Sequence, residues 1–454
     1  MSVSDEGERR LTVVPTTRVA FSSPTGTTPH RLPSPQRSAR NSGGRVIWFL
    51  RHYPITILVA APYALLFVPM AVFNANPQTA FILRLLSAAL IGTLLVETAA
   101  GMARPGRRWR PGIAAVNASH CHQYLVARLV AVVSIAASIT GARAGQGTIF
   151  TQLGDEVAAS PVARVAALSA GWSYLAFALL LSSFLGGLAN RTRVLGWIGL
   201  LVAGQIATAA LTGITSPLFG FLSFVAGAGA ICGLFRLREV VILGVVLLLA
   251  WPTLFAVRND IRVDGGVSVA DDVSAQDRMR LDLQLAHAAE YDVPVDVGQP
   301  GPSEFVRYGL VPRILDADRP TISTGVLINQ YLGGSATSSY SFLALGNVYF
   351  LVGWLGVPVY FAGWAALALL LLRARGAPGP IRLSLFCFVL AGPLLWSSGY
   401  PDAMIAFLQH TVAALPVFAL LLLLKNRMPG RHSVDRKPEV RWPLAADLRT
   451  TWRA

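Results

Sequence analysis

The chain has 454 residues, of which 54% are hydrophobic and only 13% are charged, and its mean hydropathy is +0.54. Soluble proteins carry about 25% charged residues, so this composition excludes an ordinary soluble protein and is typical of a polytopic membrane protein. The formal net charge is +15. Because the positive residues lie mainly in the tails and in alternate loops, as described below, membrane topology explains this charge and no nucleic-acid partner is predicted. Three scattered cysteines predict neither a disulfide framework nor a zinc site.

Residues 1–53 are rich in Ser, Thr, Pro and Arg and contain no signal-peptide core, which predicts a disordered tail. Apolar runs follow, and a helix needs roughly 20 such residues to cross about 30 Å of hydrocarbon. We therefore expect an all-α fold, a polytopic transmembrane helix bundle of about ten spans. The expected spans are 54–73, 79–103, 124–141, 165–188, 194–213, 216–235, 239–257, 343–372, 383–398 and 403–424.

Arginine and lysine accumulate in the two tails and in alternate loops, as they do on the cytoplasmic side of membrane proteins. The N-terminal tail through Arg51 carries eight Arg, and the C-terminal tail 425–454 carries eight Lys or Arg. The intervening loops 74–78 and 214–215 carry no charge. This alternation predicts that both termini are cytoplasmic and that spans 1–7 occupy 54–257.

One long loop, 258–342, separates spans 7 and 8, and spans 8–10 occupy 343–424. The loop has seven Arg and twelve Asp or Glu, so its formal charge is −5. The short loops on either side assign it to the exterior. Within it, Ser274 to Tyr291 has apolar residues on one face and predicts a helix that lies on the membrane or caps the bundle.

Arginines recur at both ends of this loop. Arg258 and Arg262 follow the seventh span at i, i+4, and Arg307, Arg313 and Arg319 are spaced by six residues. Arginine offers a permanent charge and a planar fork of donors suited to phosphate oxygens. The cluster predicts a diphosphate site at the outer membrane surface. The alternative is that the arginines pair with the loop's acids or with anionic lipid headgroups.

The loop also contains the sequence Asp316-Ala317-Asp318. A DxD of this kind holds a metal in many nucleotide-sugar glycosyltransferases, but nucleotide sugars are not expected outside the membrane. No metal site is therefore predicted. We expect Asp316 to serve as an arginine partner or as a base.

Charged residues inside membrane spans are costly, and each is a candidate functional residue. Arg84 and Glu97 lie thirteen residues apart in the second span, about 20 Å along a helix, so they cannot pair with each other. Arg84 should lie toward the exterior, where it either serves the site or extends to the interface. Glu97 is expected to pair with a polar group of another helix, such as Gln205, and Arg128 is expected to extend toward the cytoplasmic interface.

At its C-terminal end the loop resembles a known family. The segment from Arg307 through Leu310, the run VPRILDADRPTISTG, and the following SATSSYS and LGNVYFLVGWLG are similar to the corresponding stretch of bacterial O-antigen and oligosaccharide repeat-unit polymerases of the Wzy type. The resemblance covers about fifty residues and extends further only by topology. It implies that glycan units carried on undecaprenyl diphosphate are joined outside the membrane, without nucleotide, metal or other cofactor.

The resemblance also assigns roles to residues. Arg313 and Arg319 match basic positions of the family's loop, and Arg258 matches an arginine beyond the preceding span. The family often has a Gly-Ser-Arg-Gly-like sequence at the start of the sixth span, whereas this chain has GITSPLFG, and Arg84 is the candidate substitute. The general base would be Asp316 or His287. The diphosphate-binding candidates are Arg84, Arg258, Arg307, Arg313 and Arg319.

The same resemblance places the protein in the bacterial inner membrane. Its implied partners are the polyprenyl-diphosphate-linked glycan donor and acceptor, membrane lipid, and a chain-length regulator or a flippase. Two alternatives stay open: a ligase that moves a finished glycan to a different acceptor, and a non-enzymatic transporter or flippase of lipid-linked sugars. Transporters tend to contain two related halves, and the sequence has no such internal repeat.

Overall fold

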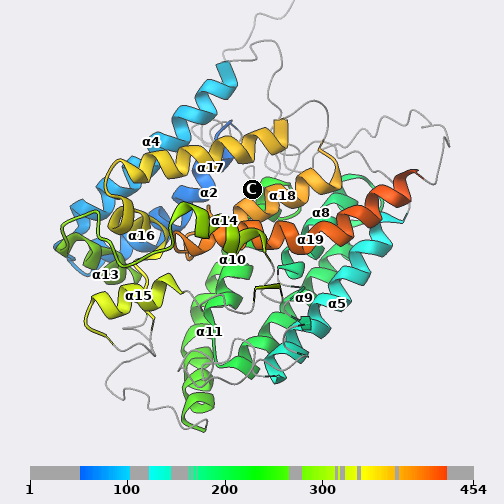
Figure 1. The fold of residues 1–454 in the computed structure, drawn as a ribbon, viewed down its shortest axis with the longest axis horizontal. Coiled ribbons are helices and arrows are strands. Elements are labelled where there is room, and N and C mark those ends of the chain that lie inside the picture. Colours follow the sequence, from blue (N-terminus) through cyan, green and yellow to red (C-terminus); the bar gives the residue numbers. More distant parts are fainter. Residues whose placement is uncertain are drawn as a thin grey trace, which may run out of the picture. The chain divides into compact units, whose positions relative to one another are not determined.

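The computed structural model describes residues 52–102, 122–144, 171–264, 279–311, 323–334, 339–373 and 378–426, together with a few isolated positions between them. Every regular element in these ranges is a helix, and the ranges contain no strand (Figure 1). The predicted all-α fold is therefore confirmed. Most of both predicted tails lies outside the described residues.

Six helices within these ranges are long and apolar enough to cross a membrane, and each coincides with a predicted span. Five shorter apolar helices accompany them, so the chain is a multi-pass helical membrane protein. The first long helix, Pro54–Phe73, consists of α2 (Pro54–Pro62), the π-helix η1 (Tyr63–Phe67) and α3 (Val68–Phe73). The other long helices are α4 (Thr79–Met102), α5 (Gln123–Arg143), α9 (Arg191–Thr212), α11 (Leu237–Asp264) and α19 (Asp402–Asn426). The short ones are α8 (Trp172–Leu185), α10 (Ser216–Ile231), α16 (Leu343–Val352), α17 (Gly356–Arg373) and α18 (Pro380–Ala391).

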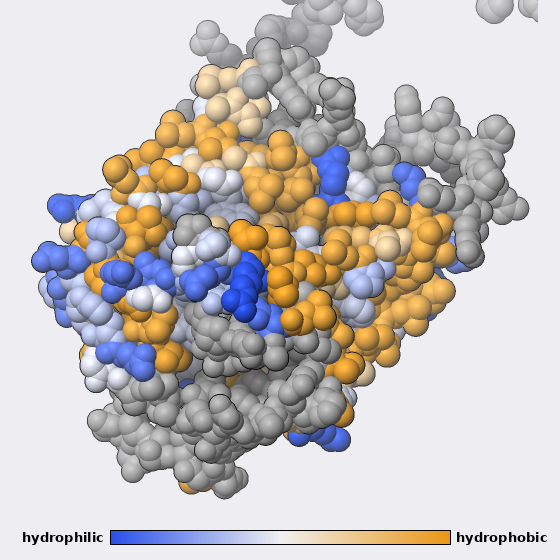
Figure 2. All heavy atoms as spheres, in the orientation of Figure 1, coloured by the Kyte–Doolittle hydropathy of each residue, from blue (hydrophilic) through white to orange (hydrophobic). Residues whose placement is uncertain are grey.

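Large apolar side chains remain exposed along several of these helices. Leu95 on α4 is 66% exposed, Val359 on α17 is 70% exposed and Leu423 on α19 is 60% exposed. Figure 2 shows apolar residues over the region of α17 and α19, whereas hydrophilic residues gather over the loop helices. Contiguous apolar surface of this kind suits contact with lipid rather than water.

The predicted eighth span is two helices rather than one. Its first part, α16, stops at Gly353, which has a φ of 83°, a backbone conformation that a glycine adopts without strain. The N–H of Leu345 lies 3.4 Å from the hydroxyl of Tyr63, in the middle of the first span. Near its other end, Tyr349 packs against Phe81 at the start of α4. The helix α16 therefore extends through only part of the bundle.

A second break follows α18, whose helix ends at Ala391, so the chain runs without regular helix from residue 392 to 401. This second break meets the start of α16. The N–H of Ala344 donates to the carbonyl of Trp396 at 3.0 Å, and the Trp396 indole donates to Ser223 Oγ at 3.1 Å. Non-helical backbone is tolerated at membrane depth where protein groups satisfy it, and these contacts do so.

The described part of the loop 258–342 contains three short helices and one 3₁₀ helix. These are α13 (Leu281–Ala286), the 3₁₀ helix η2 (His287–Glu290), α14 (Pro302–Leu310) and α15 (Thr324–Tyr331). The helix predicted from Ser274 to Tyr291 is thus shorter in the structure, and its first residues lie outside the described part of the chain. The loop packs against the bundle, since α13 contacts α3, α4 and α16.

Glu97 pairs with a different group from the one expected. Its two carboxylate oxygens accept the N–H groups of Ile55 and Thr56, each at 3.0 Å, at the start of α2. The first N–H groups of a helix have no acceptor within it, which explains why a carboxylate binds there. Glu97 thus pairs with polar groups of another helix, as predicted, but the partner is not Gln205, whose amide donates to Ser173 Oγ at 3.0 Å.

Candidate functional site

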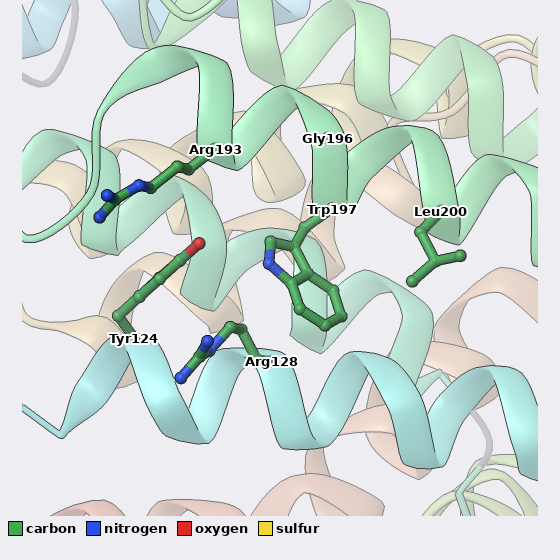
Figure 3. A pocket seen from close by; sticks show the side chains of 6 residues that line it. All are labelled: Tyr124, Arg128, Arg193, Gly196, Trp197 and Leu200. Atoms are coloured by element: carbon green, nitrogen blue, oxygen red, sulfur yellow. The ribbon is translucent and has the colours of Figure 1, made fainter.

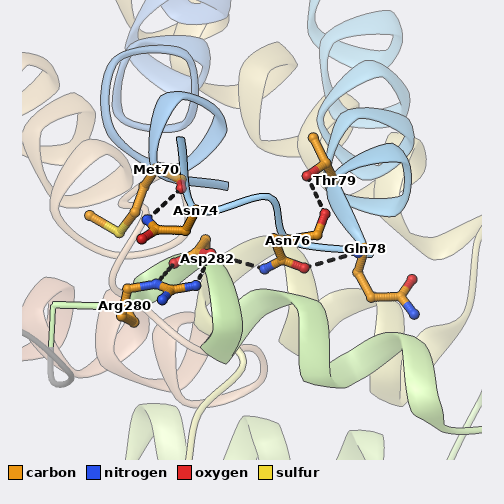
Figure 4. A network of polar contacts seen from close by, with 7 residues as sticks. All are labelled: Met70, Asn74, Asn76, Gln78, Thr79, Arg280 and Asp282. Carbon is orange, nitrogen blue, oxygen red and sulfur yellow. Dashed lines mark hydrogen bonds and ion pairs between the residues drawn. The ribbon is translucent and has the colours of Figure 1, made fainter. Parts of the chain in front are cut away.

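A hydrogen bond from Asn76 to Asp282, whose carboxylate also pairs with Arg280, joins the loop 258–342 to the turn between the first two spans (Figure 4). Arg280 donates through Nε and Nη2 to the two oxygens of Asp282 at 2.9 and 3.0 Å, and Asn76 Nδ2 donates to Asp282 Oδ2 at 2.9 Å. Burial by itself would raise the pKa of Asp282, but the hydrogen bonds from Arg280 and Asn76 and the Arg280 charge hold it below its usual value. The contact places both loops at one end of the bundle, as the charge pattern predicts.

Local packing then positions His287. Leu285 and Ala288 on either side of it are fully buried, and a Cβ added at Gly346 of α16 would lie 3.0 Å from the Leu285 side chain. This close approach depends on the glycine. With its apolar neighbours fixed against α16, the imidazole between them is directed toward the tyrosines of the loop.

Two tyrosine hydroxyls hold the imidazole of His287. Its Nδ1 lies 3.1 Å from the Tyr340 hydroxyl, and its Nε2 lies 3.1 Å from the Tyr291 hydroxyl. The Glu290 carboxylate approaches Nε2 at 3.4 Å. A neutral imidazole donates from one nitrogen and accepts at the other, so one tyrosine accepts and the other donates. The arrangement is a continuous hydrogen-bonded chain from Tyr340 through His287 to Tyr291.

Both tyrosines are kept in their neutral form. Burial and the charges of Tyr291 and Glu290 raise the pKa of Tyr340 to about 12. Burial and the Glu290 charge likewise raise the pKa of Tyr291. Neutral hydroxyls can both donate and accept, so they can orient His287 and follow a change in its protonation. The side chain of His287 is 32% exposed, which leaves it accessible to a substrate.

Arg84 lines an open groove at the same end of the bundle. It lies five residues after the start of α4, about 7.5 Å along the helix axis, and its side chain is exposed. The groove has a volume of 540 Å³ and opens on the outer surface of α4 beside Trp354. Its lining residues are Leu83, Arg84, Ser87, Ala88, Ile91 and Trp354.

The helix α16 lies between this groove and the His287 cluster. Tyr349 packs against Trp354, with ring centroids 4.9 Å apart, on the side of the Arg84 groove. The next residue, Phe350, packs against Tyr291 at 5.5 Å on the other side. The structure therefore brings Arg84 and His287, two predicted site residues, to opposite sides of one short helix.

Arg307 and Asp316 form a bidentate ion pair. Arg307 Nε donates to Asp316 Oδ2 at 2.7 Å, and Nη2 donates to Oδ1 at 2.5 Å. Both carboxylate oxygens are thus engaged by a guanidinium and do not face a substrate. This is the predicted role of arginine partner. The pair is carried by α14, which packs on α19, where Gln409 Nε2 donates to the carbonyl of Tyr308 at 2.9 Å.

Arg258, another predicted arginine, lies away from His287. Arg258 is half-buried on α11 with its guanidinium carbon 5.8 Å from the centre of the Phe255 ring, and α11 packs against α9 and α10. In Figure 1, α11 is separated from α13. Arg313 and Arg319 lie outside the described residues.

Sequence reasoning missed the two tyrosines that hold His287. Tyr291 and Tyr340 are 49 residues apart, and although Tyr340 lies in the SATSSYS segment, no local spacing pairs either tyrosine with His287. It also missed the contact of Asp402 with Thr324, whose N–H and hydroxyl donate to the carboxylate at 3.1 and 2.6 Å. Among the described residues, no group of three or more His, Cys, Asp or Glu could hold a metal ion.

Comparison with known proteins gave no relative: no family model, curated protein or solved structure matches the chain. The arrangement of the site is consequently the basis for any functional proposal.

Proposed function

We propose that the protein is an exterior-facing glycosyltransferase that polymerises undecaprenyl-diphosphate-linked oligosaccharide units. The observation that carries the proposal is His287, an accessible histidine held on both ring nitrogens by tyrosine hydroxyls. Histidine is the side chain most often used as a general base, and a base contributes about 10²- to 10⁴-fold to a rate. The similarity of residues 304–356 to Wzy-type polymerases supports the same proposal.

In this reaction His287 takes the proton of the tyrosine hydroxyl that donates to it, and that tyrosine oxygen takes the proton of the acceptor hydroxyl as the acceptor oxygen forms a bond to the anomeric carbon of the donor sugar. The bond from that carbon to the diphosphate oxygen breaks at the same time, and the lipid diphosphate leaves. The tyrosines orient the imidazole and share the proton. Because the structure engages both oxygens of Asp316 with Arg307, His287 is the preferred base of the two predicted candidates.

Arg84 is the arginine best situated to meet a lipid-linked donor. Its groove opens on the exposed side of α4, where a polyprenyl chain in the bilayer would have direct access. A guanidinium there would neutralise the leaving diphosphate, and preorganised charge of this kind is often the largest contribution to catalysis. Arg258, Arg313 and Arg319 stay candidates for the same task on the donor or the acceptor.

The test is the glycan profile of a strain that lacks the gene and is complemented with wild type, His287→Gln or His122→Gln. Glutamine keeps hydrogen-bonding capacity but cannot act as a base, and His122 is exposed at the start of α5. We expect long chains with wild type and His122→Gln, and single-unit material with His287→Gln at equal membrane abundance. Full chain length with His287→Gln would refute the role of His287.

One observation favours the transporter alternative. The short helices α16 and α18, each of which is followed by a break in the chain, resemble the discontinuous helices that form transport sites. If the protein were a flippase, loss of the gene would leave single lipid-linked units on the cytoplasmic side. If it were a polymerase, they would accumulate outside, and if it were a ligase, finished long chains would accumulate on the lipid carrier.

A further inference from the structure

A second groove lies between α5 and α9, away from the site described above (Figure 3). It has a volume of 380 Å³ and is open on one side. In the close-up, Tyr124 and Arg128 rise from α5, while Arg193, Trp197 and Leu200 project from α9. Gly196 completes the lining. Two arginines and two amphipathic aromatic residues therefore share one small groove.

Arg128 provides a buried donor that the protein leaves unused. Its Nε is buried and has no hydrogen-bond partner among the described residues. The guanidinium carbon lies 5.1 Å from the centre of the Tyr124 ring, which fixes the orientation of the group by a cation–π contact. A buried donor without a partner is costly, so a ligand that accepts a hydrogen bond would be favoured here.

Arg193 adds a second charge from the opposite wall. Arg193 lies in the first turn of α9. Asn190 caps the N-terminus of this helix, and its side chain accepts a hydrogen bond from the backbone N–H of Arg193 at 3.0 Å. Helix N-termini carry a partial positive charge that favours anions. Both α5 and α9 begin at this end of the bundle, and the charge pattern of the loops assigns this end to the cytoplasm. The field in the groove is therefore strongly positive.

The other end of the groove is apolar. Leu200 lies seven residues beyond Arg193, about 10 Å along the helix axis. Trp197 lies between them, and tryptophan is typical of membrane interfaces. A Cβ added at Gly196 would meet nothing within 4 Å, so the glycine leaves space that a ligand can enter. A charged end beside an apolar end matches a headgroup with an acyl chain better than a free anion.

We propose that this groove binds the phosphodiester headgroup of an anionic phospholipid from the cytoplasmic leaflet. Arg128 and Arg193 contact the phosphate oxygens, the Trp197 indole lies at the level of the glycerol backbone, and one acyl chain follows Leu200. The inference is independent of the reaction at the exterior site. It assigns a lipid site that stabilises the contact between α5 and α9.

The test is native mass spectrometry of the full chain in detergent with phosphatidylglycerol or phosphatidylcholine of equal acyl length. We expect about tenfold stronger retention of phosphatidylglycerol, and about a tenfold loss of this retention in Arg128→Ala, as for removal of a hydrogen bond to a charged group. Gly196→Leu should abolish retention by filling the groove, without removing a charge.

Gly199→Leu is the matched control, because Gly199 is on the same helix and also faces open space but does not line the groove. It should retain phosphatidylglycerol as wild type does. Equal retention of the two lipids, or wild-type retention by Gly196→Leu, would overturn the proposal. Displacement of phosphatidylglycerol by millimolar inorganic phosphate would assign the groove to a free anion instead and would also refute it.

Discussion

Asp282→Asn tests whether the Asp282 carboxylate, which pairs with Arg280 and accepts a hydrogen bond from Asn76, holds α13 against the turn between the first two spans. Asparagine keeps the size of the side chain but removes its charge and one acceptor oxygen, so the pair with Arg280 and at least one of the three hydrogen bonds are lost. Breaking a buried ion pair costs about 3–5 kcal/mol. Because the Arg280 side chain is 27% exposed and is partly screened by water, we expect about 2–3 kcal/mol.

Acid should remove the same stabilisation from the wild type. The pKa of Asp282 in the folded protein lies below its ordinary value, which is about 3.9 in an unfolded chain. Its contribution is therefore fully present above about pH 4 and is lost as the pH falls through the folded pKa. Scanning fluorimetry of the full chain in detergent should give an unfolding temperature several degrees lower for Asp282→Asn at pH 7, with a gap that narrows below about pH 4.

Asp296→Asn is the control for this experiment. Asp296 lies in the same loop, is exposed, and accepts a local hydrogen bond from the N–H of Gly298 at 2.8 Å. Its replacement should change the unfolding temperature by less than one degree, since surface substitutions are usually within about 0.5 kcal/mol. The reasoning fails if Asp282→Asn unfolds with the wild type at pH 7, or if the gap between them widens in acid.

Two further outcomes are expected. Gly92→Ala should destabilise the protein by about 1–3 kcal/mol, because the added Cβ would lie 2.3 Å from the carbonyl oxygen of Pro358 on α17. In the control Gly101→Ala, on the same helix, the added Cβ meets nothing within 4 Å, so this change should be neutral or stabilising. Equal unfolding temperatures of the two variants would contradict this packing. Tyr340→Phe should slow chain growth about tenfold, because it removes one hydrogen bond to His287. The measurement is the chain-length profile of a strain complemented with this variant. Full-length chains would show that Tyr340 is not part of the hydrogen-bonded chain that carries the proton.

Sequence patterns predicted much of the fold. Hydrophobic composition identified the six long helices, since burial in lipid requires runs of about 20 apolar residues, and each run carries its own signal. The charge pattern predicted that the turn 74–78 and the loop 258–342 face the same side, and the contact of Asn76 with Asp282 agrees with it. These are properties of continuous stretches, which a sequence can display directly.

The broken span shows where such patterns stop being sufficient. Residues 343–372 carry no charged side chain, so a single continuous span was predicted, although Gly353, Gly356 and Pro358 lie close to the break. Gly353 permits the break, but Tyr63, Trp396 and Phe81 determine where the two parts lie. A glycine inside a helix is tolerated when the surrounding side chains favour a continuous helix. Where the surrounding contacts do not favour it, the helix ends at the glycine.

For the candidate site, too, the sequence predicted some features and not others. Composition and charge pattern were sufficient to predict a helical, membrane-spanning protein and to select His287, Arg84, Arg307 and Asp316 as candidate residues. That Arg307 engages both oxygens of Asp316, and that two distant tyrosines hold His287, became visible in the folded chain. Residue type and local periodicity are encoded along the chain, whereas hydrogen-bond partners depend on which helices pack together, and that arrangement is set by the bundle as a whole.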